Sequence, residues 1–294
     1  MKSYSIIIPY KDNLNMLYSA VNSIPDREDI QIIIVDNSVI PLQKDLYPVK
    51  EKSEVLMLHS DPNMGAGRAR NVGLDSVNGQ FIIFCDGDDY FTESAFRVFD
   101  DYIDRGYDIV FFEADSIKLT TGEQSNRNDV TNRLVEKYLQ TGNEDLLRYG
   151  SGVPWCKMLD AKFVKDSGIR FGETRVSNDA LFSMYTGHAA QTITADRRRV
   201  YVVTEGEANT SLTKTRSADN QFIRYEVALE RFKFLESVGK AHMAIYPWVF
   251  ILQAWREFGF KEARKYYRYA KNHQVSVWHG LSLGYIFKKL MTNK

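Results

Sequence analysis

Hydrophobic and polar positions alternate through the first half of the chain in a way that is typical of an α/β fold. Four short apolar runs have the length of buried strands: residues 4–9, 30–35, 55–58 and 81–85. Helical spacing of apolar residues is found between and after these runs, at residues 14–24, 66–76 and 92–103, and a further apolar run follows at residues 109–112. Strands that alternate with helices predict a parallel sheet with crossover helices.

The second half of the chain has a different pattern. Residues 116–150 are polar and weakly periodic, with a surface loop expected at residues 120–129. Helices are expected at residues 162–167 and directly after Asp179. From Ala218 onward, apolar residues recur at helical spacing without a strong strand signal. An α/β domain followed by a small helical module is therefore predicted.

Polar residues follow three of the predicted strands. The first strand ends in residues 9–12 (PYKD), the second in residues 36–38 (DNS) and the fourth in residues 86–89 (DGDD). Carboxyl ends of parallel strands meet at one edge of a sheet, where open α/β sheets bind their ligands. Asp86 and Asp88 offer oxygen ligands that suit Mg²⁺ or Mn²⁺ and leave coordination positions for a diphosphate. The same residues also suit a polar turn, since Asp and Gly are turn formers.

Asp36 has two interpretations. At the end of the second strand, its carboxylate is placed to accept hydrogen bonds from a ribose or a nucleobase N–H; alternatively it is a cap or turn residue. The chain has no GxGxxG after the first strand and no GxxxxGK[ST], which argues against a dinucleotide site and excludes a P-loop. Phosphate must then be held by a metal ion and basic side chains.

Composition narrows the class of protein. Hydrophobic residues make up 44% of the chain, and Lys plus Arg balances Asp plus Glu at 38 each, so nothing favours a nucleic-acid partner. Two cysteines without metal-ligand spacing indicate neither zinc nor a disulfide framework. The first apolar run is too short for a secretory signal, and the longest, residues 243–255, is shorter than the roughly 18 to 20 residues that span a bilayer. A cytoplasmic protein without a transmembrane helix is expected.

Five segments together resemble the successive signatures of family 2 glycosyltransferases: SIIIPYKDN, IIIVDNS, NMGAGRARNVGL, GQFIIFCDGDD and RFGETRVSNDALF. The resemblance covers residues 1–211. It implies a GT-A fold, with a Rossmann-like, mostly parallel central sheet flanked by helices. The implied domains are a glycosyltransferase domain at residues 1–215 and a C-terminal helical extension at residues 216–294. Within the first, residues 1–115 would bind the nucleotide sugar and residues 116–215 the acceptor.

The resemblance also implies roles for individual residues. Asp36 would contact the nucleobase, Asp86 would lie near the ribose, and Asp88, with Asp86, would hold the metal ion. The implied donor-binding residues are Pro9, Tyr10, Asp36, Asn63, Arg70 and Asp86. Arg70 could pair with phosphate or with a structural carboxylate. At position 37 the family commonly has a second acidic residue, whereas this chain has Asn37. The identity of the nucleobase is therefore left open.

Asp179 is the predicted catalytic base. It precedes an apolar helical run, a position where an Asp is ordinarily a helix cap. An inverting transfer, however, needs one carboxylate that takes the proton of the acceptor hydroxyl. The family places that base in a Glu-Asp pair, which Asn178-Asp179 matches with Asn in place of Glu. Because Asn178 carries no charge, like-charge repulsion should raise the pKa of Asp179 less than it would in a Glu-Asp pair.

Two further residues and two further segments have alternative interpretations. Trp155 is either an acceptor platform or a core residue, and His188 is either a metal ligand or a helix-surface residue. Residues 209–216 resemble a loop that closes on the diphosphate, or are a polar linker. Residues 277–291 mix aromatic residues with Lys, and residues 261–271 add basic charge, a composition that suits a membrane surface. The alternative, which is the more common role of an amphipathic helix, is that these C-terminal helices pack on their own domain or on a second subunit.

The sequence thus predicts a glycosyltransferase that depends on Mn²⁺ or Mg²⁺ and inverts the anomeric centre. It would move a sugar from a nucleotide diphosphate donor, with a UDP-sugar expected, to a glycan or lipid-linked glycan in cell-surface polysaccharide synthesis. The expected location is cytoplasmic or peripheral on the inner face of the plasma membrane, and a homo-oligomer is left open. Alternatives are a sugar-1-phosphate nucleotidyltransferase, although its usual Gly-rich basic loop is missing, and a non-catalytic nucleotide-sugar-binding scaffold.

Overall fold

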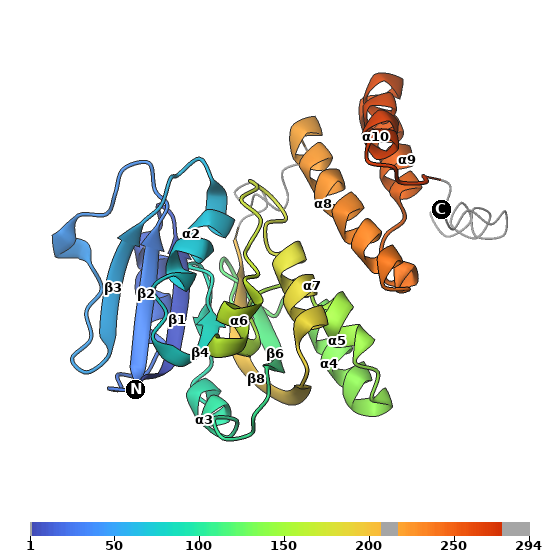
Figure 1. Cartoon of the computed structure of the whole chain (residues 1–294). Coiled ribbons are helices and arrows are strands. Elements are labelled where there is room, and N and C mark those ends of the chain that lie inside the picture. The colour runs from blue at the N-terminus through green and yellow to red at the C-terminus, as the bar shows by residue number, and fades with distance from the viewer. Residues whose placement is uncertain (1, 207–216, 278–294) are drawn as a thin grey trace. The chain divides into compact units, whose positions relative to one another are not determined.

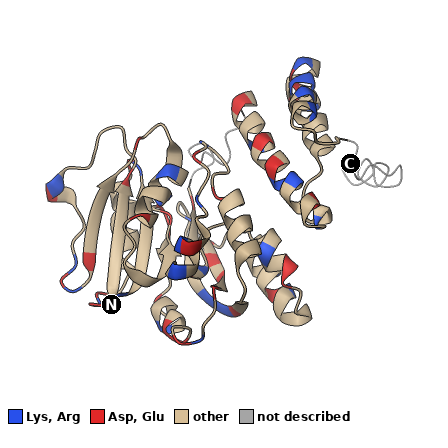
Figure 2. Cartoon of the chain, viewed as in Figure 1, with Lys and Arg blue, Asp and Glu red and all other residues tan. Residues whose placement is uncertain are grey.

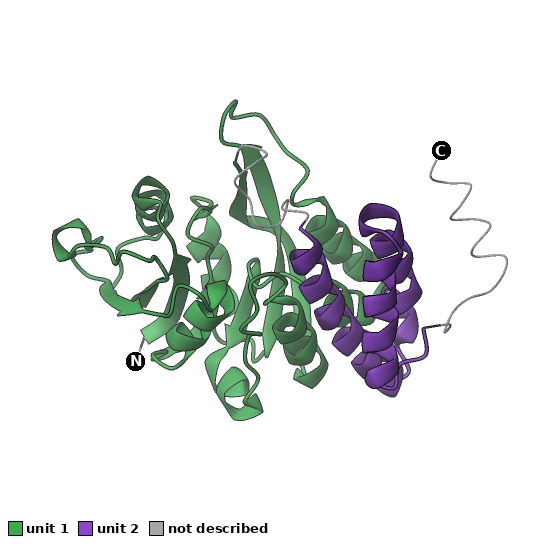
Figure 3. Cartoon of the chain, turned by 90° about the horizontal axis from the view of Figure 1, so that it is seen from above, with its two compact units in different colours: residues 1–214 green, residues 215–294 purple. Residues whose placement is uncertain are grey.

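The computed structural model describes residues 2–206 and 217–277. The chain divides into two compact units, Met1–Lys214 and Thr215–Lys294, which Figure 3 shows in green and purple. Two of the sequence-predicted segments, residues 209–216 and residues 278–291, lie outside the described residues.

The described strands of the first unit form one sheet. They are β1 (Lys2–Tyr10), β2 (Ile30–Asp36), β3 (Glu54–His59), β4 (Gly79–Phe84), β5 (Tyr90–Phe91), β6 (Ile109–Lys118), β7 (Lys157–Asp160) and β8 (Ile193–Glu205). Their order is β3-β2-β1-β4-β7-β6-β8-β5. The first four strands pair in parallel, as predicted, whereas β7 runs antiparallel to β4 and β6, and β5 to β8. The sheet is therefore mixed, with its parallel half at one side (Figure 1).

Helices cover both faces of this sheet. They are α1 (Leu14–Asn22), α2 (Gly65–Leu74), α3 (Ala95–Asp100), α4 (Asp129–Thr141), α5 (Asp145–Gly150), α6 (Ala161–Ser167) and α7 (Ala180–Ala189), with a 3₁₀ turn at Lys44–Leu46. Alternate residues of β1 pack into two different hydrophobic cores. Ile6 and Ile8 pack with residues of α1 and α3, while Ile7 packs with residues of α2, α6 and α7. Strands buried on both faces read as continuous apolar runs, which is why the sequence pattern revealed them.

Several elements do not follow from the sequence pattern. The loop at residues 120–129 is present except for its last residue, but α4 and α5 occupy most of the segment expected to be irregular. Strand β8 contains the charged run Asp196–Arg199, which hides its strand character. The register between β6 and β8 shifts beside this run, and Arg198 and Arg199 form ion pairs with acidic residues of neighbouring elements. A local bulge thus lets charged residues belong to a strand.

The second unit is helical, as predicted. Its described elements are α8 (Ala218–Ser237), a 3₁₀ turn (Ala241–Met243), α9 (Pro247–Phe258) and α10 (Phe260–Asn272). Ser217 caps α8 by accepting a hydrogen bond from the backbone N–H of Asn220 at 3.2 Å. The three helices share an apolar core that includes Tyr225, Phe232 and Tyr266. In the described part of the chain, no helix combines the length and apolar character needed to cross a membrane.

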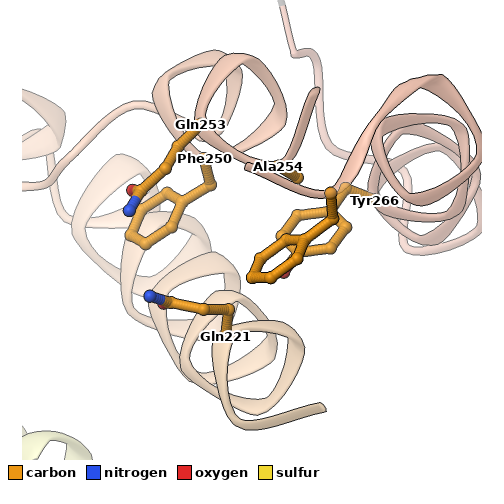
Figure 4. Close-up of a pocket in the computed structure, with 6 residues that line it drawn as sticks. Gln221, Phe250, Gln253, Ala254 and Tyr266 are labelled. Atoms are coloured by element: carbon orange, nitrogen blue, oxygen red, sulfur yellow. The ribbon is translucent and has the colours of Figure 1, made fainter. Parts of the chain in front are cut away.

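A small cavity lies among the three helices of this unit. Figure 4 shows Gln221 of α8, Phe250 and Gln253 of α9, and Tyr266 of α10 around it. Its accessible volume of about 10 Å³ is room for no more than about one water molecule. The cavity is therefore too small to be a substrate site.

Candidate active site

The ends of β1, β2 and β4 meet at one edge of the sheet. Tyr10 lies opposite Asp36 in the β1–β2 register, and the backbone N–H of Asn37 donates to the Tyr10 carbonyl at 2.8 Å. Gly87 lies so close to β1 that a side-chain carbon there would come within 2.7 Å of the Pro9 carbonyl oxygen. Only glycine permits this approach, which brings the acidic residues on either side of it to the edge.

Asp36 is the last residue of β2, and its side chain stabilises the turn that follows. Its buried carboxylate accepts hydrogen bonds from the backbone N–H groups of Ser38 at 2.9 Å and Leu42 at 2.7 Å. Two acceptor positions of the carboxylate remain, so its nucleobase contact stays a prediction. Asn63 is exposed, and its side chain donates to Asp61 at 3.0 Å.

The three acidic residues after β4 have different surroundings. Asp89 is buried and accepts hydrogen bonds from the Tyr201 hydroxyl at 2.9 Å and the Thr204 N–H at 2.7 Å. Burial, and next the charges of Asp88 and Asp86, raise the pKa of Asp89 well above its ordinary value. Asp89 therefore links the loop after β4 to β8 through hydrogen bonds. In contrast to the buried Asp89, Asp86 is half-buried and Asp88 is exposed.

The structure shows where Trp155 and His188 lie relative to the acidic residues after β4. Trp155 is buried and stacks on Tyr201 with ring centroids 5.5 Å apart, so it is a core residue beside the site. His188 is exposed on α7, and its ring contacts the Tyr149 hydroxyl at 3.0 Å. Neither residue joins the acidic cluster.

Arg70 connects the two halves of the site. Its side chain is 6% exposed and donates to Asp86 at 2.5 Å and to Asn178 at 2.9 Å. The guanidinium also lies over the Phe171 ring at 5.3 Å, while its Nε has no hydrogen-bond partner among the described residues. The planar guanidinium group has N–H donors that point in two directions, so it can contact Asp86 and Asn178 at the same time. In this structure Arg70 thus pairs with a carboxylate of the site.

Gly67 and Asn71, on either side of Arg70 in α2, explain how residues 171–178 lie against this helix. The Asn71 side chain both accepts from the Phe171 N–H at 2.9 Å and donates to the Phe171 carbonyl at 3.1 Å. At Gly67 a side-chain carbon would lie only 2.0 Å from the Gly172 carbonyl oxygen. Close contact and a paired hydrogen bond therefore fix the segment that ends in Asn178 and Asp179.

Asp179 interacts electrostatically with Arg70, Asp86 and Lys157 and does not cap α7. It occupies the position before the helix, but its side chain makes no capping hydrogen bond. The residue is half-buried, and the protein around its carboxyl group raises the pKa of Asp179 above its ordinary value. Arg70 and Lys157 oppose this rise, and Asp86 adds to it. A carboxyl group with a raised pKa between cationic and acidic neighbours is suited to accept a proton.

Lys157 is a buried cation that the sequence interpretation missed. It lies on β7 and is 3% exposed; its ammonium donates to the Ser151 carbonyl at 2.9 Å and lies over the Phe111 ring at 5.3 Å. Burial lowers the pKa of Lys157 to about 7, and the charge of Asp179 opposes the shift. The signal was present, since Lys157 is the single charged residue in an apolar run, WCKML.

Lys157 should make stability depend on pH. Its pKa is depressed from 10.5 to about 7, so the unfolded chain binds the extra proton between these values and stability rises with pH. Relative to the wild type, Lys157→Met should lose on the order of 4 kcal/mol of stability between about pH 6 and about pH 10. Urea unfolding at both pH values measures the difference. Lys165→Met, at an exposed lysine, is the matched control, and parallel pH curves for wild type and K157M would contradict the assignment.

The acidic cluster fits a metal ion only in part. Among the described residues, no group of three His, Cys, Asp or Glu side chains is placed to hold an ion. Surrounding protein, and next the charge of Asp86, raise the pKa of Asp88 even though this side chain reaches solvent. A cation would relieve that repulsion. Two carboxylates suit Mg²⁺ or Mn²⁺ when diphosphate oxygens and water complete the coordination.

Comparison with solved structures identifies the class of fold. The S. aureus TarS fragment 1–349 in complex with UDP-GlcNAc matches 88% of this chain and 73% of its own, with a TM-score of 0.63 and 20% sequence identity. The chain therefore has the GT-A fold. The sequence profile of glycosyl transferase family 2 matches residues 5–167, more than half of the chain. The chain belongs to this family.

Two curated relatives are similar over shorter stretches. A GalNAc(5)-diNAcBac-PP-undecaprenol beta-1,3-glucosyltransferase of Campylobacter jejuni is 29% identical over 121 residues, 38% of each chain. A poly(ribitol-phosphate) beta-glucosyltransferase of Bacillus spizizenii is 26% identical over 214 residues, 68% of this chain and 32% of its own. The chain spans between 14% and 38% of the length of the curated relatives that it matches.

Proposed function

We propose that this protein is an inverting glycosyltransferase that moves a sugar from a UDP-sugar to a carbohydrate hydroxyl. The main support is the bridge that Arg70 makes between Asp86 and Asn178, the neighbour of Asp179, together with the electrostatic interaction of Asp179 with Arg70 and Asp86. Membership of family 2 supports transferase chemistry. The UDP-GlcNAc in the TarS complex and the glucosyltransferase names of the two relatives support the donor class.

In the proposed reaction, the acceptor oxygen attacks the anomeric carbon from the face opposite the diphosphate. A bond forms between that oxygen and the anomeric carbon, and the bond to the diphosphate breaks with its electron pair on the leaving oxygen. Asp179 takes the acceptor proton. Arg70 and Lys157 favour the ionised form of Asp179 before the step, because their charges lower its pKa.

Asp86 and Asp88 would hold a divalent cation, which when bound neutralises charge on the leaving diphosphate. Arg70 already engages one oxygen of Asp86, which restricts the orientation of this carboxylate. The proposed acceptor is a glycan or lipid-linked glycan in polysaccharide synthesis, at the cytoplasmic side. Both relatives have names that describe transfer to such polymers or lipid-linked sugars.

Metal binding should depend on the nucleotide. Because the chain contributes two carboxylates and no third ligand in its described part, Mn²⁺ alone should bind weakly, and UDP should increase its affinity about 100-fold through the diphosphate oxygens. Isothermal titration of Mn²⁺ with and without UDP measures the increase. Asp88→Asn should abolish it, while Asp104→Asn, an exposed aspartate outside the cluster, should not. Equal affinity with and without UDP would contradict the proposed site.

The function itself is tested by product analysis. UDP-, GDP- and dTDP-sugars are incubated with the protein, Mn²⁺ and a panel of glycan acceptors, and release of the nucleoside diphosphate is measured. Release from a UDP-sugar with formation of an extended glycan supports the proposal. Pyrophosphate release from a nucleoside triphosphate and sugar-1-phosphate would favour a nucleotidyltransferase. Binding of nucleotide sugar without turnover under any condition would favour the non-catalytic scaffold.

A further inference from the structure

Helix α10 of the second unit has a strongly basic outer side. Its 13 residues contain five cations and a single acid, Glu262. Glu262 lies 3.9 Å from Lys265, and the Lys265 ammonium also lies over the Phe222 ring at 3.8 Å, so this pair is turned toward the unit's own residues. The other four cations are exposed: Lys261, Arg264, Arg268 and Lys271.

Two aromatic residues share this side of the helix. Phe260 is 73% exposed and Tyr267 is 41% exposed. Positions 260, 264, 267 and 271 follow the i, i+4, i+7, i+11 spacing of one helical stripe, and positions 261 and 268 lie on the adjoining stripe. We call these six residues the α10 outer face: Phe260, Lys261, Arg264, Tyr267, Arg268 and Lys271.

Packing fixes the direction of this face. Ala263, Tyr266 and Ala270 are buried in the core of the second unit and hold the opposite side of α10 against α8 and α9. Rotation that turned Phe260 or the cations inward would expose these three residues. Positive charge is also concentrated on this helix: Figure 2 shows blue residues gathered on α10, whereas α8 carries both red and blue residues. The four cations are therefore not matched by acids on their own helix.

We propose that the α10 outer face docks on the surface of a bilayer that contains anionic phospholipids. Exposed Arg and Lys attract the headgroup phosphates, and each such cation adds to the affinity. Aromatic rings partition into the interface between headgroups and acyl chains, which gives Phe260 and Tyr267 an apolar environment. A soluble polyanion would neutralise the same cations but would leave the Phe260 ring in water. The combination of the two residue types along one stripe thus favours a membrane.

The proposal concerns the second unit alone and is independent of sugar transfer by the first. It is tested on the full chain by co-sedimentation with vesicles of phosphatidylcholine, with and without phosphatidylglycerol, at low and high salt. Binding is expected only to the anionic vesicles, and high salt should weaken it. Arg264→Gln with Arg268→Gln should lower the partition coefficient about 30-fold. Phe260→Ser with Tyr267→Ser should lower it about tenfold with no change in net charge.

A matched control removes the same charge elsewhere. Arg97→Gln with Arg133→Gln changes two exposed arginines of α3 and α4 in the first unit and should leave vesicle binding within about twofold of the wild type. Circular dichroism and thermal unfolding establish that each variant is folded before its binding is compared. All six changed residues are exposed, so folded variants are expected.

Three outcomes would overturn the proposal. The first is failure of the folded wild type to bind anionic vesicles at low salt. The second is equal loss of binding in the α10 arginine variant and in its control, which would indicate a general charge effect. The third is binding that depends on the arginines but not on Phe260 and Tyr267, together with tight binding of soluble polyphosphate, which would indicate a polyanion site instead.

Discussion

Asp179→Asn is expected to lower the turnover of sugar transfer about 1000-fold, because a general base contributes roughly two to four orders of magnitude. The amide keeps the shape of the carboxylate but cannot accept the acceptor's proton. Donor binding should change little, since Asp36, Asp86 and Asp88 are unaffected. Steady-state kinetics with a UDP-sugar and an accepted glycan measures turnover, and titration with UDP and Mn²⁺ measures donor binding.

Asp160→Asn is the matched control for this change. Asp160 also precedes a helix, but its side chain caps α6 by accepting from the Phe163 N–H at 2.7 Å. Because Asn caps a helix as well as Asp does, this variant should keep both activity and stability. Asp179 makes no such bond, so D179N should likewise keep its unfolding free energy within about 1 kcal/mol. Near-normal turnover in folded D179N would remove Asp179 from the role of base.

Arg70→Lys is expected to have the second largest effect. An ammonium group is a point charge on a flexible stem and cannot reproduce the fork that contacts Asp86 and Asn178 together. The side chain is buried, so loss of one contact leaves a polar group without its partner, and the unfolding free energy should fall by about 2 kcal/mol. Displacement of Asp179 relative to Asp86 by even about 1 Å should lower kcat/KM about 100-fold.

Arg68→Lys, two residues earlier on α2, separates these effects from general changes in the helix. Arg68 pairs with Glu173 at 3.1 Å, and the two side chains are 47% and 32% exposed. An ion pair of this kind contributes little, so R68K should change the unfolding free energy by no more than about 0.5 kcal/mol and leave kcat/KM unchanged. Urea denaturation and kinetics of both variants provide the comparison. Similar values for R70K and R68K would show that the bridge does not organise the site.

The parallel half of the sheet could be predicted because its strands are buried on both faces. Each of β1, β2 and β4 contains an uninterrupted apolar run, at residues 6–9, 32–35 and 81–84, and a run of that kind has few alternatives when helices lie between. The elements that the sequence pattern did not predict, α4 and β8, contain both buried and exposed residues. Helix α4 buries only Thr131 and Val135 fully, and β8 has a charged run at a bulge. Polar residues there obscure the periodicity that local sequence would otherwise show.

The sequence by itself determined the α/β fold and the acidic residues at the end of β4, because these depend on local patterns within a strand and directly after it. Asp179 became the candidate base through the resemblance to family 2 glycosyltransferases, since its local position alone suits a helix cap. The tertiary structure alone decided how they combine. Asp89 is buried and forms hydrogen bonds to β8. The buried Lys157 lies close enough to Asp179 for their charges to interact. The tertiary structure also joined Asp86 to Asn178 through Arg70, across a sequence separation of 108 residues between Arg70 and Asn178. Such contacts arise from how α2 packs on the segment before α7, which no local pattern records.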